Sequence, residues 1–239
     1  MYKTAVVILN YNGLEYLKKF LGTVIQNSVY QDTIIVLADN GSTDGSADWA
    51  EANHTGLKVI RFDKNHGFAG GYNLALEHIE AEYFVLLNSD IEVSENWLTA
   101  MVDFMDNNPD VASVQPKILS WHNREMFEYA GASGGYIDKY GYAFCRGRIF
   151  NKIEKDNGKY DDTAEVFWTS GACMLIRAKA WKECGGFDED FFAHMEEIDL
   201  CWRLHNKGYK LFVIPSCAVY HIGGGTLAYN SPFKTYLNF

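Results

Sequence analysis

Apolar and polar positions alternate in regular blocks through the first 120 residues. Short runs rich in β-branched and aromatic residues predict strands, and segments whose apolar residues recur every three or four positions predict helices. The predicted strands cover residues 4–9, 33–38, 57–62 and 82–87, and the predicted helices cover residues 14–26, 46–52, 69–79 and 95–105, with Ser94 as the N-cap of the last helix. This alternation predicts an α/β fold with a mostly parallel central sheet and helices on both faces.

The second half follows a looser pattern. Residues 111–162 are rich in Gly and Tyr and predict irregular structure with short β-like pieces over one side of the sheet. Residues 165–176 predict a strand, and residues 185–187 a turn. Residues 196–207 predict a helix that ends at Gly208, followed by strands at 209–214 and 218–221. No linker or internal repeat interrupts the chain, which predicts one domain.

Polar segments follow the predicted parallel strands at the edge where such sheets bind ligands. The first strand ends in NYNG, the second in DNGSTDGS, and the fourth runs from YFVLL into Asn88, Ser89 and Asp90. Asn, Ser and Asp also suit ordinary turns and helix caps, so each segment alone is open to that simpler interpretation. A carboxylate such as Asp90 at this edge could hold a divalent cation that bridges to a diphosphate.

Two further segments have features of nucleotide binding. Asp39 is the first polar residue after a buried strand, and its carboxylate could accept a hydrogen bond from a pyrimidine base. The segment NHGFAGGYN, from Asn65 to Asn73, opens the third helix, where glycines such as Gly67 allow close backbone approach and free N–H groups favour phosphate. It does not fit the G-x-G-x-x-G pattern of a dinucleotide site.

The helix with the sequence EEIDLCWRL carries acids on two faces. Glu196, Asp199 and Arg203 share one face, whereas Glu197 projects among apolar residues such as Leu200. An acid there either frays out of the helix or lies near a reaction centre. The helix dipole would favour its ionised form, which a general base requires.

His221 ends the last predicted strand. A lone histidine in this setting is most often a satisfied core residue. A neutral imidazole is also a good ligand for a cation already bound by oxygen atoms.

Composition narrows the classes of function. The 239 residues include 21 Lys and Arg against 31 Asp and Glu, for a net charge of −10, which argues against a nucleic-acid-binding surface. An anionic ligand would therefore need a cation or backbone N–H groups. The five cysteines contain no Cys-x-x-Cys pair and predict reduced thiols in a cytoplasmic protein. No signal peptide or spanning stretch is evident, association with the inner face of a membrane is left open, and the natural chain is expected to extend beyond Phe239.

Eight segments in order resemble the inverting glycosyltransferases of family 2, which have the GT-A fold. They are VVILNYNG, VLADNGSTDGS, NHGFAGGYN, LLNSDIEV, SGACMLIR, GGFDEDFF, EEIDLCWR and VYHIGGGT. Their sequences are most similar to those of bacterial rhamnosyltransferase-like members that build surface polysaccharides. The resemblance covers nearly the whole chain and implies one domain, with a nucleotide-sugar-binding half at residues 1–120 and an acceptor and catalytic half at residues 121–239.

The resemblance also implies roles for individual residues. It implies Glu197 as the catalytic base, with Asp90 and His221 as ligands of Mg²⁺ or Mn²⁺. The implied donor-binding residues are Asn10, Asn12, Asp39, Asn65, Gly67, Asn73, Asn88 and Ser89, and the implied acceptor-binding residues are Ser170, Gly171, Glu196 and Asp199.

The expected activity is transfer of a sugar from a nucleoside diphosphate, either dTDP-rhamnose or a UDP-sugar, to a saccharide or lipid-linked hydroxyl. Two positions depart from the family pattern, because Asn88 replaces the first Asp of Asp-x-Asp and Glu197 replaces the usual Asp base. A catalytically degenerate sugar-nucleotide-binding protein is therefore an alternative. A sugar-phosphate nucleotidyltransferase is another, although NYNGLEYLKKF lacks the Gly-rich basic loop such an enzyme would have after its first strand.

Overall fold

The first half of the chain folds close to the predicted boundaries. The computed structural model describes residues 1–129 and 131–223. Its strands are β1 (Tyr2–Asn10), β2 (Thr33–Asp39), β3 (Lys58–Arg61), β4 (Ala81–Asn88), β5 (Ile91–Val93), β6 (Val111–Ser120), β7 (Gly135–Ile137), β8 (Ala143–Cys145), β9 (Arg148–Ile149), β10 (Lys152–Ile153), β11 (Ala164–Glu165), β12 (Cys173–Arg177) and β13 (Lys210–His221). Its helices are α1 (Leu14–Asn27), α2 (Ser46–Asn53), α3 (Gly67–Glu77), α4 (Trp97–Asn107), α5 (Ala178–Cys184) and α6 (Glu196–Asn206).

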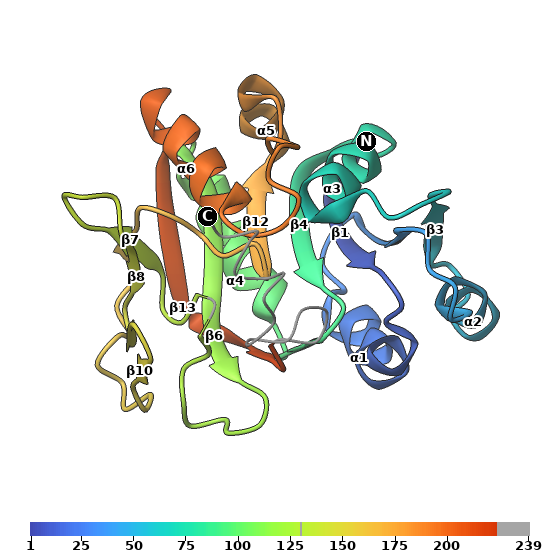
Figure 1. Ribbon diagram of the computed structural model, residues 1–239, viewed down its shortest axis with the longest axis horizontal. Coiled ribbons are helices and arrows are strands. Elements are labelled where there is room, and N and C mark those ends of the chain that lie inside the picture. The colour runs from blue at the N-terminus through green and yellow to red at the C-terminus, as the bar shows by residue number, and fades with distance from the viewer. Residues whose placement is uncertain (130, 224–239) are drawn as a thin grey trace.

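One sheet runs through both halves in the order β11-β13-β6-β12-β4-β1-β2-β3, and β5 pairs with β13 (Figure 1). Strands β4, β1, β2 and β3 are mutually parallel, and β13 is parallel to β6. Strand β12 is antiparallel to both of its neighbours. The predicted α/β fold is therefore confirmed, with a sheet that is mixed at its centre.

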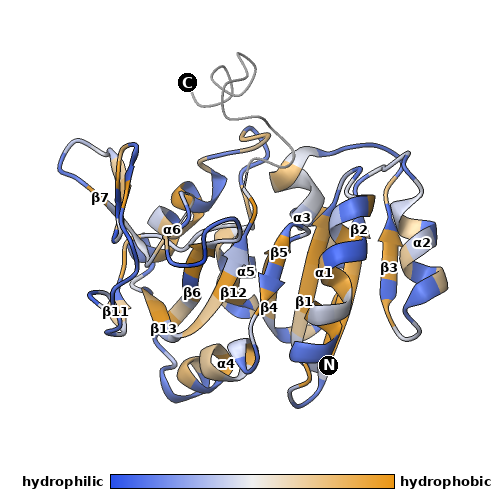
Figure 2. Cartoon of the chain, turned by 90° about the horizontal axis from the view of Figure 1, so that it is seen from below, coloured by the Kyte–Doolittle hydropathy of each residue, from blue (hydrophilic) through white to orange (hydrophobic). Residues whose placement is uncertain are grey.

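Helices cover both faces of this sheet. On one face, side chains of α3, α5 and α6 pack on alternate residues of the strands, such as Val7 and Leu86. On the other face, α1, α2 and α4 pack on the intervening residues, such as Ile8 and Leu87. Figure 2 shows the apolar strands enclosed between helices whose outer faces are polar. Burial on both faces explains why the strands are continuous apolar runs.

The structure corrects the expectation of irregular structure from residue 111 onward. Val111–Ser120 forms β6, which is buried along nearly its whole length and lies between β12 and β13. Gln115, Pro116 and Lys117 concealed this strand in the sequence. Pro116 is tolerated because β12 pairs with β6 only at Ser113 and Val114, and because a bulge in β13 lies opposite the proline.

Three smaller boundaries also differ. The strand expected at residues 165–176 is divided into β11 and β12, and residues 209–214 and 218–221 belong to the single bulged strand β13. Helix α5 was not predicted. The N-cap of α4 is Asn96 instead of Ser94, whose hydroxyl donates to the Ala218 carbonyl at 2.6 Å.

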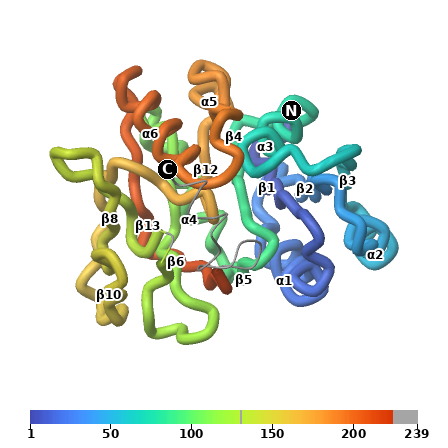
Figure 3. Tube along the Cα trace, viewed as in Figure 1, coloured from blue at the N-terminus to red at the C-terminus, as the bar shows by residue number. Residues whose placement is uncertain are grey.

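A second sheet, in the order β10-β9-β8-β7, is formed by part of the segment predicted to be irregular. Figure 3 shows it on the side of the molecule away from β3. Its link to the main sheet includes Trp168, whose backbone pairs with Gly135 and whose indole N–H donates to the Tyr136 carbonyl at 3.1 Å.

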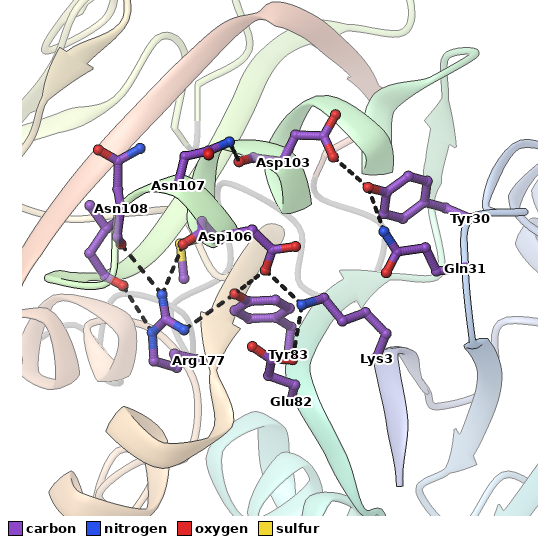
Figure 4. A network of polar contacts seen from close by, with 12 residues as sticks. Lys3, Tyr30, Gln31, Glu82, Tyr83, Asp103, Asp106, Asn107, Asn108 and Arg177 are labelled. Atoms are coloured by element: carbon purple, nitrogen blue, oxygen red, sulfur yellow. Dashed lines mark hydrogen bonds and ion pairs between the residues drawn. The ribbon is translucent and has the colours of Figure 1, made fainter.

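A polar network joins the sheet to α4 near the amino ends of β1 and β4 (Figure 4). One carboxylate oxygen of Asp106 accepts from Lys3 and from the Tyr83 hydroxyl, both at 2.7 Å. Arg177 donates to the Tyr83 hydroxyl at 3.2 Å and to the Met105 carbonyl at 3.0 Å. These contacts fix the edge of the sheet opposite the polar strand ends.

Candidate active site

Strand register brings the polar strand ends together. Asn10, at the end of β1, lies opposite Asp39 at the end of β2. On its other side, β1 places Leu9 opposite Asn88 at the end of β4. Ser89 Oγ also lies near Gly13, because a Cβ atom added to that glycine would be 3.3 Å from it. Segments that are far apart in sequence thus form one edge.

Side chains tie the first two loops to each other. The Asn10 amide donates to Asp39 Oδ1 at 3.1 Å and to Ser46 Oγ at 2.8 Å. Asn12, which has a φ of 51°, accepts from the Thr43 N–H at 2.8 Å. Asp44, in the loop before α2, caps α1 by accepting from the Leu14 N–H at 2.9 Å. These hydrogen bonds hold the two loops in a fixed relation to each other.

Asn65 and Gly67 shape the start of α3. Asn65 Oδ1 accepts from the Gly67 N–H at 2.8 Å and from the Asn40 amide at 3.0 Å. Gly67 has a φ of 74°, and a Cβ atom there would lie 2.6 Å from the Phe192 carbonyl oxygen. Only glycine fits this position, because the segment before α6 packs directly against it.

Asn73 fixes the other end of that segment. Its amide donates to the Phe187 carbonyl at 2.9 Å, and its Oδ1 accepts from the Phe187 N–H at 3.0 Å. The side chain thereby pairs with the backbone of GGFDEDFF as a strand neighbour would. A direct role for Asn73 in donor binding stays a prediction.

Asp90 and His221 lie in contact, as predicted. His221 Nε2 is 3.1 Å from Asp90 Oδ1 and 3.5 Å from the Asn88 amide nitrogen. Antiparallel pairing of β13 with β5 produces this approach, because His221 lies opposite Ile91. Both side chains are buried.

Glu128 is a site residue that the sequence analysis missed. Its Oε2 lies 3.3 Å from His221 Nδ1, so the imidazole is held between two carboxylates. Burial alone would lower the pKa of His221, but the charges and hydrogen bonds of Asp90 and Glu128 outweigh it and raise the pKa to about 10. The two carboxylates thus favour the protonated form of His221, whereas ligation of a cation requires the neutral imidazole. FEYAG offers no signal that could have identified Glu128.

The segment before β12 links these groups to α6. The Asn88 N–H donates to the Ala172 carbonyl at 3.0 Å. The preceding residue, Gly171, lies between Phe68 and Glu197, because a Cβ atom there would be 3.2 Å from the Phe68 ring and 3.7 Å from Glu197 Cβ. Ser170 is buried, and its backbone N–H donates to Gln115 at 2.9 Å. The predicted acceptor residues 170 and 171 thus adjoin the predicted base.

Glu196 is buried and Glu197 is half-buried at the start of α6. One oxygen of each, Oε2, is shielded from solvent and has no hydrogen-bond partner in the described part of the chain. Burial raises the pKa of Glu197, and burial together with the charge of Glu197 raises that of Glu196 well above its ordinary value. The helix start was expected to favour the ionised form of Glu197; backbone hydrogen bonds there do lower its pKa, but desolvation outweighs them.

The backbone before these carboxyl groups is strained. His194 and Met195 are non-glycine residues with φ values of 76° and 74°, and Met195 is the N-cap of α6. Consecutive left-handed residues cost energy and persist only where the surroundings enforce them. Packing of Phe192 on Gly67 provides part of that constraint.

Asp199 lies one turn along the same helix. Its Oδ2 accepts from Arg203 Nε at 2.8 Å and from Nη2 at 2.6 Å, which is the pair within the helix that the spacing predicted. Arg203 also donates to the Cys184 carbonyl at 2.6 Å and so joins α6 to α5. A role for Asp199 in acceptor binding stays a prediction.

No helix in the described residues is long and apolar enough to cross a membrane. The same residues contain no group of three or more His, Cys, Asp and Glu side chains placed to hold a metal ion. The glycine-rich end of VYHIGGGT lies partly outside the described residues.

Known structures share this fold. GalNAc-T7, solved with UDP, GalNAc and Mn²⁺, superposes with a TM-score of 0.73 at 16% identity, over 92% of this chain and 44% of that one. The mannosyltransferase PcManGT of Pyrobaculum calidifontis, solved with GDP-Man and Mn²⁺, has a TM-score of 0.62 at 18% identity, over 91% and 57%. This chain thus spans about half the length of these two proteins. The likeness confirms the GT-A-like fold.

Curated relatives include bacterial rhamnosyltransferases. The N-acetylglucosaminyl-diphospho-decaprenol L-rhamnosyltransferase of Mycobacterium tuberculosis is 24% identical over 90% of this chain and 75% of its own. Rhamnosyltransferase WbbL of Escherichia coli is 24% identical over 90% and 82%. The model of glycosyl transferase family 2 matches residues 5–185. The chain is therefore a glycosyltransferase and belongs to glycosyl transferase family 2.

Proposed function

We propose that the chain transfers a sugar, with inversion, from a nucleoside diphosphate to a hydroxyl of a saccharide or lipid-linked acceptor in surface polysaccharide synthesis. dTDP-rhamnose is the favoured donor and a UDP-sugar the next. The observation that carries the proposal is one continuous set of contacts. Asp90 touches His221, His221 lies beside Asn88, and Asn88 is joined through Ala172 to Gly171 and Glu197.

The donor would lie over the ends of β1, β2 and β4. Asp39 and Asn12 flank the loops that would hold the base and ribose. At the start of α3 the N–H groups of Gly67 and Phe68 already donate to Asn65 and to the Phe192 carbonyl, so this turn would shape the donor site through its backbone path and not by donating to phosphate. Asn10 is fully buried and bonded to Asp39, which supports an indirect role for it in holding that carboxylate in place.

The donor set at Asp90 fits a divalent cation. The His221 imidazole lies within hydrogen-bond distance of both the Asp90 carboxylate and the Asn88 amide nitrogen, and Mg²⁺ or Mn²⁺ accepts carboxylate and imidazole ligands alongside diphosphate oxygens. Because metal ligation requires a free imidazole nitrogen, binding would release the proton shared by His221 and Asp90. When bound, the cation offsets negative charge on the departing diphosphate.

Glu197 would act as the general base. The acceptor hydroxyl oxygen attacks the anomeric carbon while the bond from that carbon to the diphosphate oxygen breaks. The hydroxyl proton passes to Glu197, and the nucleoside diphosphate leaves with the bonding electrons. A raised pKa suits this task, because a carboxylate with a higher pKa is the stronger proton acceptor once it is deprotonated. Attack from the side opposite the diphosphate inverts the anomeric configuration.

Release of nucleoside diphosphate tests this function. Wild-type protein is incubated with Mn²⁺, a panel of nucleotide sugars, and an N-acetylglucosaminyl diphospho-lipid as acceptor. The proposal predicts acceptor-dependent release with one donor, an inverted linkage, and a loss of at least 100-fold in Glu197→Gln.

A matched control is Glu183→Gln, the same substitution on helix α5. Glu183 accepts a hydrogen bond from the Tyr209 hydroxyl at 2.8 Å and has no proposed role in transfer. It should keep wild-type turnover. Tight nucleotide-sugar binding with no turnover for any donor would instead indicate the degenerate binding protein. Near-normal turnover in Glu197→Gln would reject the assignment of the base.

A further inference from the structure

Glu128 is a buried acid to which the proposed mechanism gives no role. It is only 4% exposed, and its Oε2 lies 3.3 Å from His221 Nδ1. A carboxylate so far from solvent costs free energy, and a neutral side chain of similar size would avoid that cost. The contact with His221 is therefore the feature that needs a physical reason.

The end of β6 holds both residues, one on each side. On one side β13 runs parallel to β6, and His221 lies opposite Ser120. On the other side residues 126–128 run antiparallel to β6, and the Glu128 N–H donates to the Ile118 carbonyl at 3.0 Å. Backbone pairing with one strand thus sets the position of the carboxylate relative to the imidazole.

Phe127 anchors the segment that carries Glu128. It is 1% exposed, forms a bridge with Leu119, and donates its N–H to the Glu154 carbonyl at 3.1 Å. Its ring lies so close to Gly147 that a Cβ atom on that glycine would be 2.4 Å from it. Gly147 joins β8 to β9 and Glu154 follows β10, so the small sheet supports this segment.

The two ring nitrogens of His221 face different groups. Nε2 is 3.1 Å from Asp90 Oδ1 and 3.5 Å from the Asn88 amide nitrogen, whereas Nδ1 is the atom beside Glu128. Nδ1 is shielded from solvent and makes no hydrogen bond of regular geometry in the part of the chain that the structure describes, so the Glu128 carboxylate is an acceptor within reach of its proton. A histidine that ligates a metal ion through one nitrogen commonly donates its other N–H to a carboxylate.

Glu128 also changes the charge of the candidate cation site. Asn88 is neutral where the family has the first Asp of Asp-x-Asp, so Asp90 is the one acid in the segment NSD. Glu128 places a second negative charge beside the imidazole from a distant segment. The affinity of such sites for divalent cations depends on the charge that surrounds the ion.

We infer that Glu128 is a positioning residue of the candidate cation site: it holds the Nδ1–H of His221, so that Nε2 faces the cation, and it supplies negative charge that Asn88 lacks. This inference rests on the proposed function. Glu128 acts through the imidazole and not by contact with the nucleotide. Loss of its charge therefore weakens binding of the cation and leaves binding of the nucleotide alone unchanged.

Calorimetry with UDP, in Mn²⁺ or in EDTA, tests the charge. The increase in UDP affinity that Mn²⁺ causes should fall about tenfold or more in Glu128→Gln, with no change in EDTA. Adding Asn88→Asp to Glu128→Gln should restore most of the increase, because it returns a negative charge to the site. Glu154→Gln should behave as the wild type, because Glu154 accepts from the Tyr160 hydroxyl at 3.1 Å, outside the candidate site.

NMR of protein labelled with ¹⁵N-histidine, in the presence of Mg²⁺ and UDP, tests the orientation of the imidazole. In the wild type, His221 should carry its ring proton on Nδ1 and leave Nε2 unprotonated. Glu128→Leu, which has no acceptor for that proton, should not hold His221 in this single tautomer.

A full Mn²⁺ effect in Glu128→Gln, no Mn²⁺ effect in the wild type, an equal loss of UDP affinity in EDTA, or no rescue by Asn88→Asp would overturn the inference. A ring proton on Nε2 in the wild-type complex would do the same, and this measurement needs no variant that folds. Because neither assay involves transfer, absence of sugar transfer with the expected Mn²⁺ effects would reject the proposed function alone.

Discussion

Individual carboxyl groups carry the chemistry proposed for this protein, and their surroundings set their proton affinity. Glu197 lies beside Gly171 and near Glu196, in a setting that disfavours charge on both acids. Asp90 is different, because the His221 imidazolium holds its pKa below the ordinary value even though burial pushes the other way. Neighbouring residues thus lower the pKa of Asp90, which keeps it ionised as a cation ligand must be. They raise the pKa of Glu197, the proposed base.

The raised pKa of Glu197 predicts the pH dependence of transfer. A base must be deprotonated to act, so kcat/KM should fall about tenfold per pH unit below the pKa of Glu197, and that limb should lie above the ordinary glutamate value of about 4.3. A pH profile of kcat/KM with the best donor checks this. Full activity retained down to pH 4.5 would contradict it.

Site residues could be predicted from the sequence where the ends of strands converge. They could not be predicted where contacts between distant segments bring a side chain to the site. Asp39 and Asp90 follow apolar runs, so the parallel arrangement predicted that they lie at the same edge of the sheet, whereas the contact of His221 with Asp90 was implied only by the family resemblance and is produced by antiparallel pairing of β13 with β5. Glu128 follows no such pattern, because it reaches the site through pairing between residues 126–128 and β6. The sequence therefore indicated only part of the candidate site.

At the level of elements, α3 and α6 are coupled by the segment between α5 and α6. Asn73 holds Phe187, Gly67 accommodates Phe192, and the two strained residues before Glu196 follow directly. The orientation of the base thus depends on contacts outside its own helix. Pattern reasoning predicted each helix but not this coupling, because hydrogen bonds from a side chain to a distant backbone leave no periodic signal.

Asn73→Ala is expected to loosen this segment. Loss of the paired hydrogen bonds to Phe187 should lower the free energy of unfolding by about 2 kcal/mol. Transfer should also fall, because the position of Glu197 depends on this segment, and a larger fall in nucleoside diphosphate affinity than in stability would indicate the direct donor contact predicted for Asn73. Chemical denaturation and calorimetry measure both; wild-type stability and turnover together would refute the coupling.

The opposite edge of the sheet offers a test of stability alone. Burial would raise the pKa of Asp106, but hydrogen bonds and charge from Lys3, with Tyr83, lower it. A depressed pKa stabilises the fold above the unfolded value of about 3.9, and this contribution is lost as pH falls through the folded value. Asp106→Asn should therefore cost about 1 kcal/mol at pH 7, since the site is partly exposed, and much less near pH 3.

Thermal unfolding of Asp106→Asn across this pH range makes the comparison. Turnover at pH 7 should be unchanged, because the network lies at the far edge of the sheet (Figure 4). An equal stability difference at both pH values would show that the carboxylate charge does not stabilise this edge.

For the whole molecule, one mixed sheet unites the half proposed to bind the donor with the half proposed to carry the base. Strand β12 enters between β4 and β6, so residues 170–172 and α6 face the ends of the parallel strands. The alternating first half was predictable from periodicity. The insertion of β12 and the buried β6 were not, since polar residues interrupt β6 and antiparallel insertion depends on contacts across 80 or more residues in sequence.

Metal-dependent binding of a nucleoside diphosphate tests the central claim most directly, namely that Asp90 holds the donor through a cation while Glu197 acts only on the acceptor. Calorimetry with dTDP or UDP, with Mn²⁺ or with EDTA, is performed on wild type, Asp90→Ala and Glu197→Gln. The account predicts that Mn²⁺ strengthens binding at least tenfold in wild type and Glu197→Gln, and that Asp90→Ala loses this gain. Equal metal-dependent affinity in Asp90→Ala, or its loss in Glu197→Gln, would contradict the account.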